Sequence, residues 1–188
     1  MQNEASMNDT VVFHVVTDRP MQVGQHIIFD AQHHSGVYSR VMEQLDTVKD
    51  VYAHPDRYPA PLEHHLDVAL RELAMEDVRK AYYPQYPSRM ASLYVSRTLE
   101  EAQRWGEFFA RIGRPTYAIA ELRVNGRCFL GNACNCFDGT ANYEDNVAKA
   151  HHYWQNLPNE DGEYIWEMLV DGDIELVRFV QEINANIP

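Results

Sequence analysis

One glutamate is a candidate for chemistry because its neighbours along the chain are apolar. Glu167 lies in the run Ile165-Trp166-Glu167-Met168-Leu169-Val170, which is predicted as a strand. A carboxylate in apolar surroundings is unfavourable unless it is paired or lines a cavity. On a central strand, Glu167 is therefore a candidate catalytic residue. On an edge strand, it would only face solvent.

Two further strands carry residues that could bind a ligand. His14 lies in the β-branched run of residues 11–16, which predicts a central strand. Tyr94 and Ser96 lie where a short strand meets a helix, whose start is marked by a capping box at residues 98–101. A helix N-terminus favours an anionic ligand. The plainer alternative is that His14 and Tyr94 only pack in the core.

The cysteines offer a second kind of chemistry. Cys128, Cys134 and Cys136 are clustered, and His151 and His152 follow them. Their odd number argues against a disulfide framework. Their spacing matches no standard zinc motif. We therefore predict no metal site. A zinc-dependent protein is the alternative, and a metal assay that finds no bound zinc would exclude it.

The elements that must position these residues alternate between short strands and helices. Asn125-Gly126 and Asp171-Gly172 both predict tight turns of β-hairpins. Amphipathic patterns predict helices over residues 62–80, 98–112 and 142–154, and a short one over residues 39–48. The rest of residues 30–61 is predicted to be irregular. This order favours an α+β fold with a mostly antiparallel sheet over a βαβ array.

Composition narrows the class of protein. The 188 residues carry a formal net charge of −12, which does not suit a general nucleic-acid binder. We expect a polar N-terminal tail over residues 1–10 and a single domain over residues 11–188. The sequence contains no signal-peptide pattern and no apolar run of membrane-spanning length. We expect a cytoplasmic protein, or one delivered by a signal-less route, with no membrane partner.

Three motifs occur in an order that resembles a known superfamily. Phe13-His14-Val15-Val16-Thr17, Ser92-Leu93-Tyr94-Val95-Ser96 and Trp166-Glu167-Met168-Leu169-Val170 resemble the His-Tyr-Glu arrangement of the diphtheria-toxin-like ADP-ribosyltransferases. The chain is also similar to a bacterial family of uncharacterised domains that we place in the same superfamily. The resemblance covers most of the chain. It implies a split antiparallel β core with flanking helices, which binds NAD in a cleft as a substrate.

The resemblance also implies roles for single residues. His14 would hydrogen-bond the adenosine ribose, and Tyr94 would stack on the nicotinamide ring, whose flat cationic face suits an aromatic side chain. Glu167 would hold a hydroxyl of the nicotinamide ribose and stabilise the positive charge that develops as nicotinamide leaves. Three hydroxyl residues complete the implied NAD-binding set: Thr17, Ser92 and Ser96.

The sequence departs from the superfamily pattern at two places. Members usually have a small residue after the histidine, whereas Val15 and Val16 follow His14 here. Members that modify arginine have Glu or Gln two residues before the catalytic glutamate, where this chain has Ile165. We therefore do not expect arginine to be the acceptor.

The implied function is transfer of ADP-ribose from NAD to an unidentified acceptor, which could be a protein, a nucleic acid or a small molecule. Such an enzyme could be a toxin, an effector, a phage-defence component or a drug-modifying enzyme, and an inhibitory partner could restrain it. The alternative is a catalytically silent module on the same fold, which binds NAD, ADP-ribose or another protein.

Overall fold

The structure is a computed structural model that describes residues 5–30, 32–159 and 161–183. The chain divides into two compact units. The sheet unit comprises Met1–Phe29, Leu93–Leu130 and Trp166–Pro188, and the helical unit comprises Asp30–Ser92 and Gly131–Ile165. The elements in chain order are β1 (Ser6–Thr17), β2 (His26–Ile27), α1 (Gly36–Ala53), η1 (Pro55–Arg57), α2 (His64–Tyr82), β3 (Leu93–Val95), α3 (Leu99–Arg111), β4 (Thr116–Asn132), η2 (Ala133–Asn135), α4 (Tyr143–Trp154), β5 (Trp166–Val170) and β6 (Asp173–Glu182).

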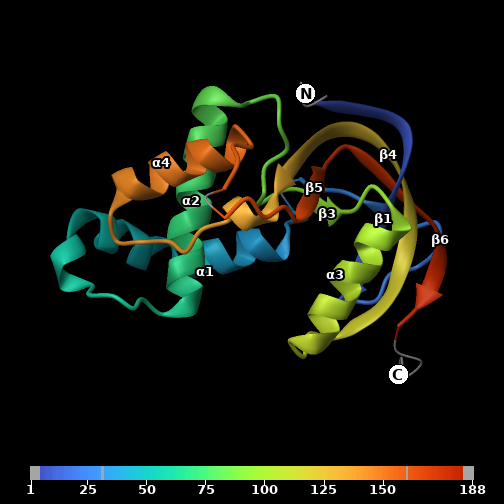
Figure 1. Ribbon diagram of the computed structural model, residues 1–188, viewed down its shortest axis with the longest axis horizontal. Coiled ribbons are helices and arrows are strands. Elements are labelled where there is room, and N and C mark those ends of the chain that lie inside the picture. The colour runs from blue at the N-terminus through green and yellow to red at the C-terminus, as the bar shows by residue number, and fades with distance from the viewer. Residues whose placement is uncertain (1–4, 31, 160, 184–188) are drawn as a thin grey trace. The chain divides into compact units, whose positions relative to one another are not determined.

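The sheet unit is built on one curled antiparallel sheet (Figure 1). Its strands run in the order β2-β6-β4-β5-β3, and β1 pairs with β4 beside this path. The curl brings β3 back to β1, where the backbones of Phe13 and Ser96 exchange hydrogen bonds of 2.9 and 2.7 Å. The strands β1, β4, β5 and β3 therefore form a closed circuit.

Alternation along the strands gives this sheet two packed faces. One face forms a core to which β1 contributes Val12 and Val16, with apolar side chains of β3, β4, β5 and β6 around them. The other face of β1 and β4 carries Val15 and Ile119, which pack against Ala102 of the amphipathic helix α3. Residues 6–10, expected as part of a polar tail, belong to β1.

Both predicted hairpin turns are wrong as hairpins, although the chain does turn sharply at one of them. β4 runs without a break through Asn125 and Gly126. Asp171 and Gly172 connect β5 to β6, but β4 lies between these two strands in the sheet. A Cβ on Gly126 would lie 1.8 Å from the carbonyl oxygen of Asp171, and Gly172 has a φ of +98°. Gly126 is therefore needed for close backbone approach rather than for a turn.

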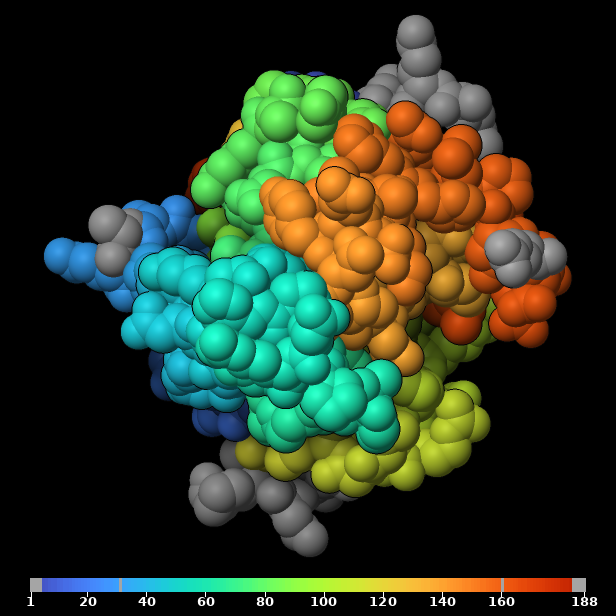
Figure 2. Space-filling view, turned by 90° about the vertical axis from the view of Figure 1, so that its left-hand side faces the viewer, coloured from blue at the N-terminus to red at the C-terminus, as the bar shows by residue number. Residues whose placement is uncertain are grey.

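The helical unit packs α2 between α1 and α4 (Figure 1). On the face drawn in Figure 2, the cyan to turquoise segment of α1 and η1, the green end of α2 and the orange α4 form the surface of this unit. The core between α1 and α2 includes Val41, Val48 and Leu70. The expectation of a mostly irregular section over residues 30–61 is wrong, because α1 extends well beyond the short helix predicted there. It begins at an N-cap, Ser35, whose hydroxyl accepts a hydrogen bond from the backbone of Tyr38.

The predicted α+β class with an antiparallel sheet is confirmed, and the three longer predicted helices correspond to α2, α3 and α4. In the described residues, no helix combines the length and the apolar character that crossing a membrane requires.

Candidate functional site

Glu167 lies on an interior strand of the curled sheet. β5 is flanked by β4 on one side and β3 on the other, so the alternative of an edge strand is wrong. Only 9% of the Glu167 surface is exposed, and the rest of β5 after it is buried. The carboxylate is therefore held in a largely water-excluded environment, where an electrostatic interaction is stronger than in bulk water.

Tyr94 lies on the strand next to Glu167. In the antiparallel pairing of β3 with β5, Tyr94 is opposite Leu169. Directly opposed residues project to the same face of a sheet, and so do residues two apart on one strand. Tyr94 and Glu167 therefore share a face, while Val95 and Met168 project to the core on the other face.

His14 is joined to the same strand by a hydrogen bond. Its Nδ1 lies 2.8 Å from the carbonyl oxygen of Tyr94. A carbonyl only accepts, so Nδ1 carries the proton and donates. Burial lowers the pKa of His14 to about 4, against the opposing effect of the Tyr94 hydrogen bond and with a smaller contribution from Arg114. The ring is therefore neutral at pH 7, and its Nε2 is left as an acceptor.

The start of α3 is stabilised by the chain itself. Thr98 is the N-cap, and its hydroxyl accepts from the backbone of Glu101. The Glu101 carboxylate in turn accepts from the backbone N–H of Arg97 at 3.0 Å and pairs with its guanidinium. A negative charge is thus already supplied at this helix N-terminus, which weakens the expectation of an anionic ligand there. Ser96, just before it, is buried and paired with β1.

Two residues that the sequence did not single out hold the start of β5 in place. The indole N–H of Trp105, on α3, donates to the carbonyl of Trp166 at 3.1 Å. The guanidinium of Arg97 lies over the Trp166 ring, 5.0 Å from its centre. These contacts fix the residue directly before Glu167. The sequence signal for the first contact is the tryptophan itself, since the indole N–H of a packed tryptophan usually finds a partner.

The remaining expected site residues do not all gather around these three. Thr17 pairs with Thr116 at the end of β1, and three residues of extended strand place it about 10 Å along from His14. Ser92 precedes β3 in the helical unit and is buried, and its Oγ has no hydrogen-bond partner among the described residues. The structure thus places His14, Tyr94 and Glu167 on β1, β3 and β5, with Ser96 directly after β3, and separates Thr17 from them.

The cysteines do not form a metal centre in the part of the chain that the structure describes, where no three His, Cys, Asp or Glu side chains are grouped to hold an ion. Cys128 is buried in the core of the sheet unit, whereas Cys134 and Cys136 are partly exposed in the helical unit.

Comparison with known proteins identifies the family of the chain. Residues 12–185 match the family described as "Protein of unknown function (DUF2441)", and the chain belongs to it. No curated protein gives a significant match. The match spans all the strands and helices described above except the first part of β1.

Proposed function

We propose that this protein is an NAD-dependent ADP-ribosyltransferase whose curled sheet is the split β core of that superfamily. The observation that carries the proposal is the position of Glu167. It is a buried carboxylate on an interior strand, and it shares a face with Tyr94 on the neighbouring strand. His14, on β1, donates a hydrogen bond from its ring to the backbone carbonyl of Tyr94.

Each of the three residues has a role in cleavage of the nicotinamide–ribose bond. Nε2 of neutral His14 accepts a hydrogen bond from a hydroxyl of the adenosine ribose. Tyr94 stacks on the nicotinamide ring. Glu167 binds a hydroxyl of the nicotinamide ribose and stabilises the positive charge on the anomeric carbon, as a carboxylate does in glycosidases.

The transfer itself needs no further cofactor. The bond between the anomeric carbon and the pyridinium nitrogen breaks, and nicotinamide leaves as a neutral molecule with the electron pair. A nucleophile of the acceptor then bonds to the anomeric carbon and loses its proton. Ile165 occupies the position where arginine-directed members have Glu or Gln, so the acceptor is another group.

The bulky residues after His14 are the main departure from the superfamily, and the structure offers a use for them. Val16 packs in the inner core of the sheet, and Val15 packs under α3. The same departure favours a second candidate function, a module that binds NAD without cleaving it.

The decisive experiment measures nicotinamide release from NAD by the purified chain and by Glu167→Gln. Gln keeps the shape of the side chain but removes its charge, so we expect release to fall at least a hundredfold. Glu175→Gln, on β6 of the same sheet, is the matched control and should keep full activity.

The outcomes separate the two candidates. Release that depends on Glu167 supports the transferase, and labelled NAD in a cell lysate then identifies the acceptor. A rise in melting temperature with NAD, without release even in lysate, supports the silent binding module. Full activity in Glu167→Gln, or neither release nor a melting shift with NAD, would overturn the proposal.

A further inference from the structure

The ladder between β3 and β5 ends directly beside Glu167. Its last pair is Val95 with Met168. If the same register continued, Arg97 would lie opposite Trp166, the first residue of β5. The guanidinium of Arg97 does lie over the Trp166 ring, as side chains of opposed residues do. The two residues are therefore neighbours, although the ladder has ended before it reaches them.

The backbone groups of these two residues bond to α3 and not to each other. The residue before Arg97 exchanges its backbone hydrogen bonds with β1, so the N–H of Arg97 is the next one that would face β5 in a continued ladder. It donates instead to the carboxylate of Glu101 at 3.0 Å. The carbonyl of Trp166 accepts from the indole N–H of Trp105 at 3.1 Å. Side chains on one face of α3 therefore take the two groups that another ladder pair would have joined.

The hydrogen bond from Trp105 acts on the peptide group that carries Glu167. The Trp166 carbonyl and the N–H of Glu167 belong to the same planar peptide group. A donor bound to that carbonyl restrains rotation of the plane about the bonds on either side of it. It thereby restrains the direction in which the Glu167 side chain leaves the backbone. The carboxylate lies at the far end of this side chain, so a small rotation of the peptide moves it further than the peptide itself.

The indole of Trp105 is itself held by packing. Its ring stacks on Phe109, with the ring centres 5.7 Å apart, and meets Phe108 edge-on. It also packs against the buried cluster that includes Ala102 and Ile119, between α3 and the sheet. A side chain can orient a neighbouring group only if its own rotamer is fixed in this way.

We propose that Trp105 is a positioning residue for Glu167, because its indole N–H holds the peptide group from which the Glu167 side chain projects. Its contribution to the reaction is to keep the carboxylate where positive charge develops on the ribose. The proposal gives Trp105 no contact with NAD or with the acceptor. It rests on the function proposed above, but the restraint of the peptide group can be measured without NAD.

The test uses Trp105→Phe, which keeps an aromatic ring against Phe109 and removes the N–H. Trp154→Phe is the matched control. Trp154, in the helical unit, is 2% exposed, and its indole N–H donates to the carbonyl of Met75 at 2.9 Å. Both substitutions remove the same atoms and the same kind of hydrogen bond, so a general loss of stability would affect both variants.

Nicotinamide release from NAD gives the functional measurement, at a temperature where both variants stay folded. We expect kcat to be about tenfold lower in Trp105→Phe with KM changed about twofold or less, because a misplaced carboxylate is felt mainly in the transition state. Trp154→Phe should keep both constants of the unmodified chain.

Hydrogen exchange of the Glu167 amide, followed by NMR, gives the structural measurement. Loss of one hydrogen bond at this peptide group should make the amide exchange about fivefold to tenfold faster in Trp105→Phe. The amides of Leu122 and Val124, which are buried on β4, report opening of the whole sheet. The change at Glu167 should exceed the change at these two amides by that factor, and Trp154→Phe should show no such local difference.

The outcomes separate this proposal from the proposed function. A lower kcat and faster local exchange in Trp105→Phe, with neither in Trp154→Phe, support it. An unchanged kcat in Trp105→Phe, an equal fall in Trp154→Phe, or exchange at Glu167 that changes no more than on β4 would each overturn it. If the unmodified chain releases no nicotinamide, the transferase assignment fails, and the exchange measurement alone decides whether Trp105 holds this peptide group.

Discussion

His14 is held in its neutral form by the same surroundings that place it beside β3. Burial lowers its pKa to about 4 from an ordinary value of 6.5, and Nδ1 is committed to the carbonyl of Tyr94. A neutral ring can accept a hydrogen bond at Nε2, whereas a protonated ring cannot. The role proposed for His14 with a ribose hydroxyl therefore holds over the whole physiological pH range.

The depressed pKa of His14 predicts how stability changes with pH. Between about pH 6.5 and about pH 4 the unfolded chain binds a proton at this position and the folded protein does not. Stability is therefore lost as the pH falls through this window, and the loss from this group ends below about pH 4. In His14→Gln we expect a smaller decrease in the urea midpoint between pH 7 and pH 5 than in the unmodified chain.

The matched control for this prediction is His64→Gln, since His64 is exposed at the start of α2. It should reproduce the pH dependence of the unmodified chain. Equal slopes in all three proteins would show that His14 does not titrate in this way.

The long strand β4 organises the sheet unit. It pairs with β1 and β6 over residues 116–127 and also with β5, and the chain bends sharply after β5 to continue as β6. At the bend, the backbones of Gly126 and Gly172 come into close contact: a Cβ on Gly172 would lie 2.8 Å from the Cα of Gly126. This contact holds the C-terminal end of β5, the strand that carries Glu167, against β4.

Gly126→Ala should therefore destabilise the fold. A Cβ there would meet the carbonyl oxygen of Asp171 at 1.8 Å, so the backbone must shift. We expect a loss of about 3 kcal/mol in the free energy of unfolding, at the upper end for overpacking, measured by urea denaturation.

Gly36→Ala is the control for that substitution. A Cβ at Gly36 meets no described atom within 4 Å, and Gly36 is the first residue of α1. Its stability should be unchanged or slightly raised, because alanine is the better helix former. Equal effects of the two substitutions would contradict the role given to Gly126.

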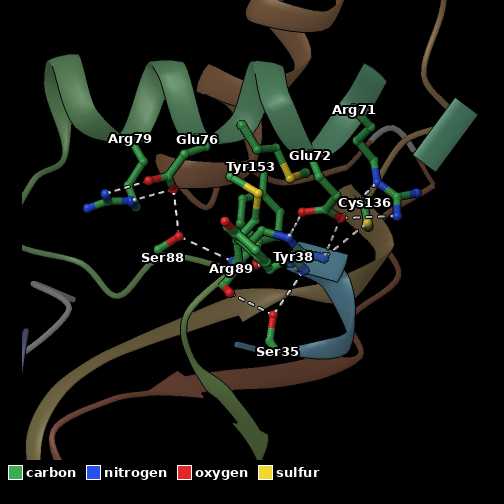
Figure 3. A network of polar contacts seen from close by, with 12 residues as sticks. Ser35, Tyr38, Arg71, Glu72, Glu76, Arg79, Ser88, Arg89, Cys136 and Tyr153 are labelled. Carbon is green, nitrogen blue, oxygen red and sulfur yellow. Dashed lines mark hydrogen bonds and ion pairs between the residues drawn. The ribbon is translucent and has the colours of Figure 1, made fainter. Parts of the chain in front are cut away.

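The molecule contains buried and exposed ion pairs, and the two kinds contribute differently to its stability. In the helical unit, Glu72 and Arg89 form a buried ion pair, and Arg71 pairs with the same Glu72 carboxylate (Figure 3). Glu100 and Arg104 on α3 are each 74% exposed in their side chains. Water and salt screen the exposed pair, whereas removal of one partner from the buried pair leaves a charge in the interior.

Glu72→Gln should accordingly lower the free energy of unfolding by about 3–5 kcal/mol, as is typical for a broken buried pair. Glu100→Gln, the matched surface substitution, should have little effect. Urea denaturation at pH 7 measures both. The loss in Glu72→Gln should shrink at low pH, because the depressed pKa of Glu72 makes its contribution disappear as the carboxyl becomes protonated. A loss that does not change with pH would argue against an electrostatic origin.

The sequence by itself determined the α+β class and the three longer helices, and it singled out His14, Tyr94 and Glu167 as candidates for a site. Periodicity and capping reach only a few residues along the chain, and α2, α3 and α4 depend on such local contacts. Glu167 could be singled out because a charged residue in an apolar strand is visible without knowing the partners of that strand.

Only the tertiary structure decided which strands are neighbours. A glycine serves a tight turn and a close backbone contact equally well, since both require the absence of a Cβ, so Asn125-Gly126 is ambiguous in sequence. Long-range pairing made β4 continuous, placed it between β5 and β6, and left Glu167 on an interior strand. The same is true of Glu72, Arg89 and Cys136, whose interaction depends on segments that are far apart in sequence and meet only in the folded unit.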